Sequence, residues 1–147
     1  MLNLITGPVT INCNSSYDTE VTTHGSIIQS PNYPSSYEPG KNCRITIRFS
    51  DRILLRFLDF DVEACSDSCC DYLIVFDGPV AEYTSWDDLN DPRQMGKKLC
   101  GYTNPGKMVS SGTTMHLLFQ TDSTQQRNGF RIQALETGKL LINFQTL

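Results

Sequence analysis

The six cysteines of this 147-residue sequence are the side chains with the most definite chemistry: Cys13, Cys43, Cys65, Cys69, Cys70 and Cys100. Cysteine sulfurs form disulfides or bind zinc, and the tight cluster at 65, 69 and 70 allows either. Structural zinc usually takes two closely spaced pairs, whereas the other three cysteines stand alone. An even number in a small β-rich chain therefore predicts three disulfides, no free thiol, and a secreted or extracellular protein.

Charge and hydropathy limit the partners of the chain. The net charge is −4 and no run of lysine or arginine occurs, so binding through a nucleic-acid backbone is not expected. No apolar segment approaches the ~20 residues that a membrane span needs. Asn14-Ser15-Ser16 is an acceptor sequence for N-glycosylation, which agrees with secretion.

Groups that could catalyse a reaction are few. The histidines are His24 and His116, and we expect a structural role for His116 in mid-strand. No serine lies in a Gly-x-Ser-x-Gly turn. Glu63 and Asp71 could form a glycosidase-like carboxylate pair, although a cation held between them would prevent either from acting as an acid. The sequence predicts that this is not an enzyme.

Strands must position these residues, because the dominant pattern is alternation of apolar and polar side chains with period two. It predicts strands at 44–49, 115–119 and 130–134. Residues 53–60 and 72–76 are also predicted as strands, and both are apolar on both faces. No segment has a capped helical pattern, and only 82–89 could form a short helix. Several short strands separated by turn residues predict an all-β, antiparallel sandwich or barrel.

The organisation along the chain follows from composition. Residues 1–12 are expected to be an N-terminal leader segment, and 79–95 a long polar loop. The main domain is expected at 13–136. Residues 137–147 are left open as a C-terminal tail or linker, with a further strand possible at 140–142.

Several motifs occur in an order that closely resembles a CUB domain over residues 13–136. They are Gly25 to Tyr37, Phe60 to Glu63, Cys69 to Leu73, Phe76 to Gly78, Leu118 to Ser123 and Asn128 to Phe130, together with Cys13, Cys43 and Leu99 to Gly101. The resemblance implies a jelly-roll β-sandwich with disulfides, an extracellular location and a role in protein–protein recognition.

Two departures from the family pattern bear on the predictions. Ile45 stands where the family usually has tryptophan, and it still suits an inward strand position. Three clustered cysteines stand where the family has one. The resemblance implies a Cys13–Cys43 bridge and a bridge from one cluster cysteine to Cys100. A bond between adjacent Cys69 and Cys70 would be strained, so Cys65 is expected to pair with one of those two.

The resemblance also implies a calcium site. The calcium-binding branch of the family uses one tyrosine, one glutamate and two aspartates, and here those positions hold Tyr37, Glu63, Asp71 and Asp122. Three carboxylates at one end of the sandwich could provide part of the six to eight oxygens that Ca²⁺ takes. Tyr37 would orient a ligand carboxylate by a hydrogen bond. The competing interpretation is that these acids are solvated loop residues.

In that branch the ligand carboxylates also receive a lysine of the partner. The expected partner is therefore an extracellular protein with an exposed lysine, bound at Tyr37, Glu63, Asp71, Asp122 and Ser123. Two other functions stay open. One is a metal-independent carbohydrate- or surface-binding module of spermadhesin type, and the other is a non-catalytic spacer domain of a larger secreted protease or receptor.

Overall fold

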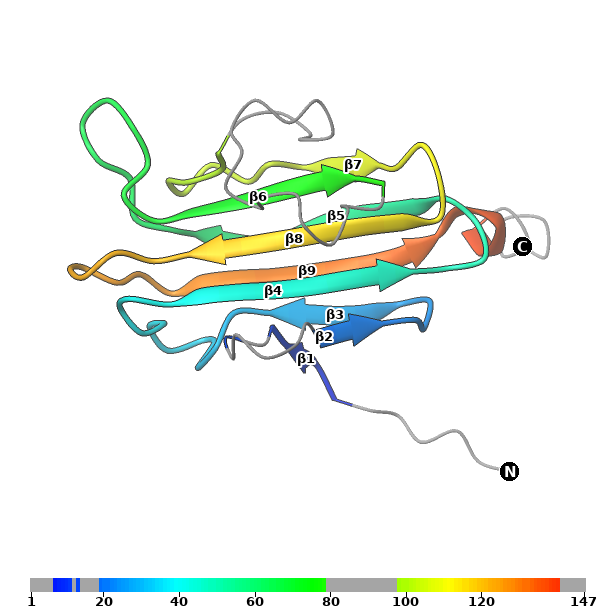
Figure 1. Cartoon of the computed structure of the whole chain (residues 1–147), viewed down its shortest axis with the longest axis horizontal. Helices are drawn as coiled ribbons and strands as arrows, with labels where there is room; N and C mark the ends of the chain where they lie inside the picture. The colour runs from blue at the N-terminus through cyan, green and yellow to red at the C-terminus, as the bar shows by residue number, and fades with distance from the viewer. Residues whose placement is uncertain (1–6, 12, 14–18, 79–97, 141–147) are drawn as a thin grey trace.

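A computed structural model describes residues 7–11, 13, 19–78 and 98–140. In this part of the chain the strands are β1 (Val9–Thr10), β2 (Thr19–Val21), β3 (Ser26–Gln29), β4 (Asn42–Arg48), β5 (Ile53–Asp61), β6 (Tyr72–Asp77), β7 (Lys107–Val109), β8 (Thr114–Gln120) and β9 (Gly129–Glu136). They form a five-stranded sheet, β1-β3-β9-β5-β7, and a four-stranded sheet, β2-β4-β8-β6. The two sheets lie face to face (Figure 1).

The predicted β-sandwich is confirmed, and the sequence patterns located its five longest strands. β4 pairs with β8, β8 with β6, β9 with β5, and β3 with β9, all antiparallel. The sequence pattern missed the short strands β1, β2, β3 and β7. Two of them depart from the predicted antiparallel pairing, because β1 pairs with β3 and β2 with β4 in parallel.

The sandwich begins earlier than the sequence predicted. Val9 and Thr10 pair with Ile28 and Gln29, and Ile11 is 1% exposed in the core. This part of the expected leader segment therefore belongs to the sheet, because three apolar or β-branched residues complete its edge. At the other end, residues 137–140 are helical and follow β9 directly.

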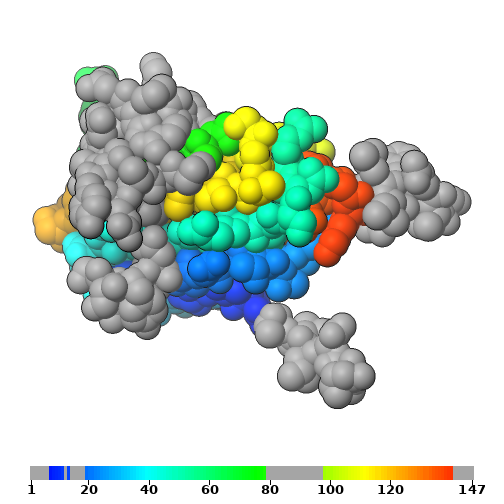
Figure 2. Space-filling view, turned by 45° about the vertical axis from the view of Figure 1, so that its right-hand side comes forward, coloured from blue at the N-terminus to red at the C-terminus, as the bar shows by residue number. Residues whose placement is uncertain are grey.

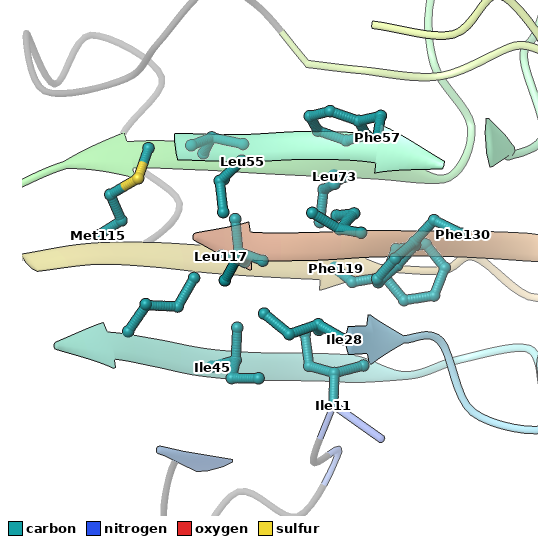
Figure 3. Close-up of a cluster of buried hydrophobic side chains, with 14 of the residues drawn as sticks. Ile11, Ile28, Ile45, Leu55, Phe57, Leu73, Met115, Leu117, Phe119 and Phe130 are labelled. Atoms are coloured by element: carbon teal, nitrogen blue, oxygen red, sulfur yellow. The ribbon is translucent and has the colours of Figure 1, made fainter. Parts of the chain in front are cut away.

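The core lies between the two sheets and is built from one face of each strand (Figure 3). Ile45 and Leu117 project into it from the four-stranded sheet, and both are fully buried. Ile45 thus holds the inward position that the sequence predicted for it. Phe119 packs edge-to-face against Phe130 of the other sheet, with ring centroids 5.0 Å apart. Such contacts add to the stabilisation from burial.

Strand β5 is apolar on both faces, but only one face is buried. Its register against β9 shifts between Phe57 and Asp59, as expected for a β-bulge. Phe57 and Phe60 both reach the core on either side of the shift, whereas Leu58 is 40% exposed. The composition of β5 agrees with the predicted two apolar faces, and the structure buries one of them.

The outer face of the four-stranded sheet carries a second, smaller buried cluster of Ile74, Phe76 and Leu118, with Tyr72 against it. These side chains alternate with core residues along β6 and β8, so they point away from the core. The space-filling view shows β8 and β4 side by side on this face of the molecule, as neighbours in the four-stranded sheet (Figure 2). Apolar residues on both faces of β6 agree with the sequence pattern.

Three disulfides join the six cysteines, and no cysteine of the described residues is free. The pairs are Cys13–Cys43, Cys65–Cys70 and Cys69–Cys100. This agrees with the predicted count and selects Cys70 as the partner of Cys65. Cys13–Cys43 ties the N-terminal segment to β4. Cys69–Cys100 holds the loop before β6 against the chain at Leu99.

Gly129 is the first residue of β9, and its backbone lies close to the side chain of Ser30. Its φ of +94° is rarely adopted by other residues, and a Cβ here would meet the Ser30 Oγ at 1.9 Å. That Oγ accepts a hydrogen bond from the Phe130 N–H at 3.0 Å. We expect Gly129→Ala to lower the free energy of unfolding by about 2–3 kcal/mol, measured by urea denaturation.

The matched control is Gly112→Ala, since a Cβ there meets nothing within 4 Å and its φ is unremarkable. We expect a change below about 0.5 kcal/mol for this control. Equal losses in the two variants would show that the close approach at Gly129 is not what constrains the position.

Candidate metal centre

Three loops that carry the predicted site residues meet at one end of the sandwich. They join β3 to β4, β5 to β6, and β8 to β9, and all three lie at the left of Figure 1. Tyr37 belongs to the first loop, Glu63 and Asp71 to the second, and Asp122 to the third. The first and third loops are hydrogen-bonded to each other: Tyr37 N–H donates to the Arg127 carbonyl at 3.2 Å, and Gly40 N–H to the Asp122 carbonyl at 2.7 Å.

The Tyr37 hydroxyl lies at the centre of this arrangement. It donates to Asp71 Oδ2 at 2.6 Å and accepts from the Glu63 N–H at 3.0 Å. Its ring is buried edge-to-face against Phe119, with centroids 5.0 Å apart. Tyr37 therefore links the β5–β6 loop to the core. The sequence predicted this hydrogen bond to a carboxylate, and the structure selects Asp71 as the acceptor.

Asp71 is fully buried, and each of its oxygens has a partner. Oδ2 accepts from Tyr37, and Oδ1 accepts from the backbone N–H of Asp122 at 2.7 Å. The side chain thus holds the β8–β9 loop in place. Each carboxylate oxygen has two lone pairs, so both could still face a cation.

Glu63 and Asp122 come together beside Asp71. A carboxylate oxygen of each lies within 4.8 Å of the other and of Cys70 Sγ. Asp71 is not in this set of mutually close atoms among the described residues. Cys70 is bonded to Cys65, so its sulfur is not a thiolate ligand. Sequence reasoning missed the position of this sulfur, although its place next to Asp71 in the chain was a signal.

Burial and mutual repulsion raise the pKa values of two of these acids. The pKa of Glu63 is raised by desolvation first, and then by the negative charges of Asp122 and Asp71. The pKa of Asp71 is raised by desolvation, although hydrogen bonds from Tyr37 and from the Asp122 N–H oppose this shift. Clustered carboxylates that are costly to ionise are the environment that a cation relieves.

The donor set fits a hard cation. Glu63 is 8% exposed, and its Oε1 is buried without a hydrogen-bond partner among the described residues. Asp122 Oδ1 accepts from Thr124 N–H at 3.0 Å, which orients its carboxylate. Calcium prefers carboxylate and carbonyl oxygens on loops, as offered here. A buried, unpaired carboxylate oxygen costs free energy unless a ligand satisfies it.

The other predicted residues have simpler surroundings. Ser123 is exposed beside Asp122. Asn14 and the expected helix at 82–89 lie outside the described residues. Asp61 pairs with Arg127 Nε at 3.1 Å. His116 is buried and hydrogen-bonded to Thr46 at 2.9 Å, which agrees with the structural role expected for it.

We expect Tyr37→Phe to lower the free energy of unfolding by about 1–3 kcal/mol. The substitution keeps the ring against Phe119 but leaves Asp71 Oδ2 and the Glu63 N–H without their shared partner, and both groups are buried. Urea denaturation measures the effect. Tyr102→Phe is the control at an exposed tyrosine, and we expect no measurable change there. A loss below about 0.3 kcal/mol for Tyr37→Phe would contradict this account of the hydroxyl.

Residues 13–133 match the family described as the CUB domain. The chain belongs to the CUB domain family. CUB domains are generally non-catalytic interaction modules of extracellular proteins. Among the residues that the structure describes, no helix has the length and apolar character needed to cross a membrane.

Relatives of this CUB domain are longer proteins. Tolloid-like protein 2 of Mus musculus is 34% identical over 114 residues, which cover 76% of this chain and 10% of the relative. Cubilin of Rattus norvegicus is 37% identical over 114 residues, which cover 76% of this chain and 3% of cubilin. Human tumor necrosis factor-inducible gene 6 protein is 32% identical over 109 residues, which cover 73% of this chain and 36% of that protein. The chain thus spans a small part of each relative.

Solved structures share the fold. The full extracellular region of zebrafish Gpr126/Adgrg6 aligns with a TM-score of 0.65 at 27% identity, over 84% of this chain and 14% of that one. The MASP-1 CUB2 domain bound to Ca²⁺ aligns with a TM-score of 0.65 at 24% identity, over 80% of this chain and 96% of that one. This second likeness is one of fold alone.

Proposed function

We propose that this CUB domain is a secreted recognition module that binds Ca²⁺ at Glu63, Asp71 and Asp122 and captures a lysine of a protein partner there. The observation that carries the proposal is the buried, unpaired Glu63 Oε1 within a group of clustered carboxylates. The raised pKa values of Glu63 and Asp71 support it, because a cation would relieve their repulsion. The calcium-bound CUB2 domain of MASP-1 is consistent with such a site on this fold.

Bound calcium would hold the three loops in one arrangement and leave a net negative charge on the carboxylates. Three carboxylates against one divalent ion leave about one negative charge unbalanced. A lysine ammonium can use this charge as a compact point donor, which suits a small oxygen-lined site better than the broad guanidinium of arginine. Ser123 is exposed next to Asp122 and could accept a further hydrogen bond.

Surface plasmon resonance tests this proposal with a defined probe. Biotinylated nine-residue peptides with one central lysine are displayed densely on streptavidin, and the domain flows over them in 5 mM calcium. We expect binding that is lost in chelator, weakened by salt, and lost when the lysine becomes alanine. Arginine in place of lysine should weaken it.

Variants of the domain distinguish binding at the proposed site from a general effect of the negative charge of the domain. Asp122→Asn should abolish binding, whereas Asp67→Asn, which removes the same charge from an exposed position in the β5–β6 loop, should leave it unchanged. Undiminished lysine-dependent binding in chelator would instead favour the metal-independent, spermadhesin-type module. Absence of any lysine dependence in calcium would overturn the proposed lysine capture.

A further inference from the structure

A cleft with a volume of about 190 Å³ opens directly beside the metal centre. Its lining includes Val62 and Gly101, which exchange both backbone hydrogen bonds, at 3.0 and 2.7 Å. Glu63 lines the cleft and also belongs to the carboxylate cluster. A partner that places a lysine at the metal centre must therefore pass next to this cleft.

The walls of the cleft are suited to contact with a partner. Tyr102 is 82% exposed, the most exposed of the large hydrophobic side chains in the described part of the chain. Arg127 stands on the opposite loop, with its side chain 52% exposed. Tyrosine and arginine are over-represented among the residues that dominate binding energy at interfaces.

The backbone of the cleft is also unusual. Gln125 lines the cleft with a φ of +53°, in the left-handed region that residues other than glycine rarely adopt. Strained positions of this kind cluster at ligand-binding sites, where the surrounding structure maintains them. The exposed amide of Gln125 adds a further hydrogen-bonding group to the wall.

The unused hydrogen-bond donors of Arg127 indicate which ligand the cleft suits. The Arg127 Nε donates to Asp61 Oδ1 at 3.1 Å, and among the described residues Asp61 is the side chain that accepts a hydrogen bond from it. The positive charge of Arg127 also acts on Glu63, where it opposes the rise of the pKa. Guanidinium has five N–H donors in a planar fork, so the terminal nitrogens keep donors for a second carboxylate. Asp61 is engaged by Arg127, and Glu63 is assigned to the cation. The groups left for a ligand are the terminal N–H donors of Arg127, together with the Tyr102 hydroxyl and the Gln125 amide, which both donate and accept.

The geometry points to a second recognition site: the cleft binds an acidic side chain of the protein partner, one or two residues from the captured lysine. Arg127 donates hydrogen bonds to its carboxylate, and Tyr102 covers it on the exposed side. Glu63 belongs to both sites, and consecutive Cα atoms are about 3.8 Å apart, so we expect the acidic residue within two residues of the lysine. This inference rests on the proposed function, because the lysine sets the register of the partner.

Peptide binding tests the second site. The nine-residue lysine peptides carry one glutamate at position −2, −1, +1 or +2 from the lysine, each with a glutamine counterpart, and all are measured in 5 mM calcium. For at least one position we expect the glutamate peptide to bind about threefold to tenfold more tightly than its glutamine counterpart. Arg127→Gln should remove that preference while calcium-dependent lysine binding persists.

Arg56→Gln is the matched control. It removes the same charge from the outer face of the five-stranded sheet, where the Arg56 Nη2 donates to Gln133 Oε1 at 2.9 Å, and it should keep the glutamate preference. Tyr102→Ala should weaken glutamate and glutamine peptides alike, without a loss of stability at so exposed a position.

The outcomes distinguish the two proposals. Equal binding of glutamate and glutamine peptides at all four positions, with lysine and calcium still required, would overturn the acidic site and leave the proposed function standing. A glutamate preference that survives Arg127→Gln would also overturn it. If no lysine peptide binds in calcium, the proposed function fails and the acidic site fails with it.

Discussion

Replacing Cys13 and Cys43 together by alanine is expected to lower the free energy of unfolding by about 3–4 kcal/mol. The bridge spans a sequence separation of 30 residues, and the loop-closure estimate for a loop of this length gives this amount. The loss also frees the N-terminal segment, whose residues Val9 and Thr10 form the edge of the five-stranded sheet. Urea denaturation of the oxidised proteins measures the effect.

The Cys65–Cys70 bridge supplies the comparison. Its separation is 5 residues, so its double alanine variant should lose only about 2 kcal/mol on the same estimate. An equal or larger loss at Cys65–Cys70 would contradict the loop-entropy account. It would instead indicate that this bridge stabilises the β5–β6 loop through its contacts with the carboxylates.

The second large effect concerns pH and calcium together. In calcium-depleted buffer the raised pKa values mean that folded Glu63 and Asp71 hold protons more tightly than the unfolded chain does. This stabilising contribution is complete below the ordinary pKa values of 4.5 and 3.8, and it is lost as the pH rises through the raised values. Calcium at the proposed site would require the ionised carboxylates, so the stabilisation by calcium is expected to grow over the same interval.

We therefore expect 5 mM calcium to raise Tm by about 3–8 °C at pH 7.5 and by almost nothing at pH 4. The first figure follows from a Kd of about 10⁻⁴–10⁻³ M, which gives about 1–2 kcal/mol by mass action on the folded state. Differential scanning calorimetry at both pH values measures it, and Asp67→Asn should behave like the wild type. A calcium effect of equal size at both pH values would show that Glu63 and Asp71 are not the groups that bind the ion.

The sequence predicted the centre of the fold better than its edges. Period-two alternation located β4 and β9, whereas runs of apolar, β-branched and aromatic residues located β5, β6 and β8. β1 and β7 have two and three residues, which is too short for any periodic pattern. The bulge in β5 was not predictable, since it depends on the register against β9 and not on the composition of β5.

For the candidate site, too, the sequence predicted one part and the structure was needed for the rest. The resemblance to the CUB family implied one site for Tyr37, Glu63, Asp71 and Asp122 at one end of the sandwich. The separate role of each of these side chains depends on its hydrogen bonds and its burial, which the sequence does not reveal. Only the structure shows that Asp71 is held by Tyr37 and by the Asp122 N–H, while Glu63 keeps a buried, unpaired oxygen. The cleft of Tyr102 and Arg127 has no sequence signal, because its walls come from loops far apart in the chain.

A calcium titration followed by two-dimensional ¹H–¹⁵N NMR tests the central claim most directly. We expect saturable shifts, with a Kd of about 10⁻⁴–10⁻³ M, concentrated at the backbone amides of Tyr37, Glu63, Asp71 and Asp122. In Asp122→Asn these shifts should vanish, and in Asp67→Asn they should remain. Shifts that leave those four amides unchanged at 10 mM calcium, or that are the same in Asp122→Asn, would contradict a calcium site at this end of the sandwich.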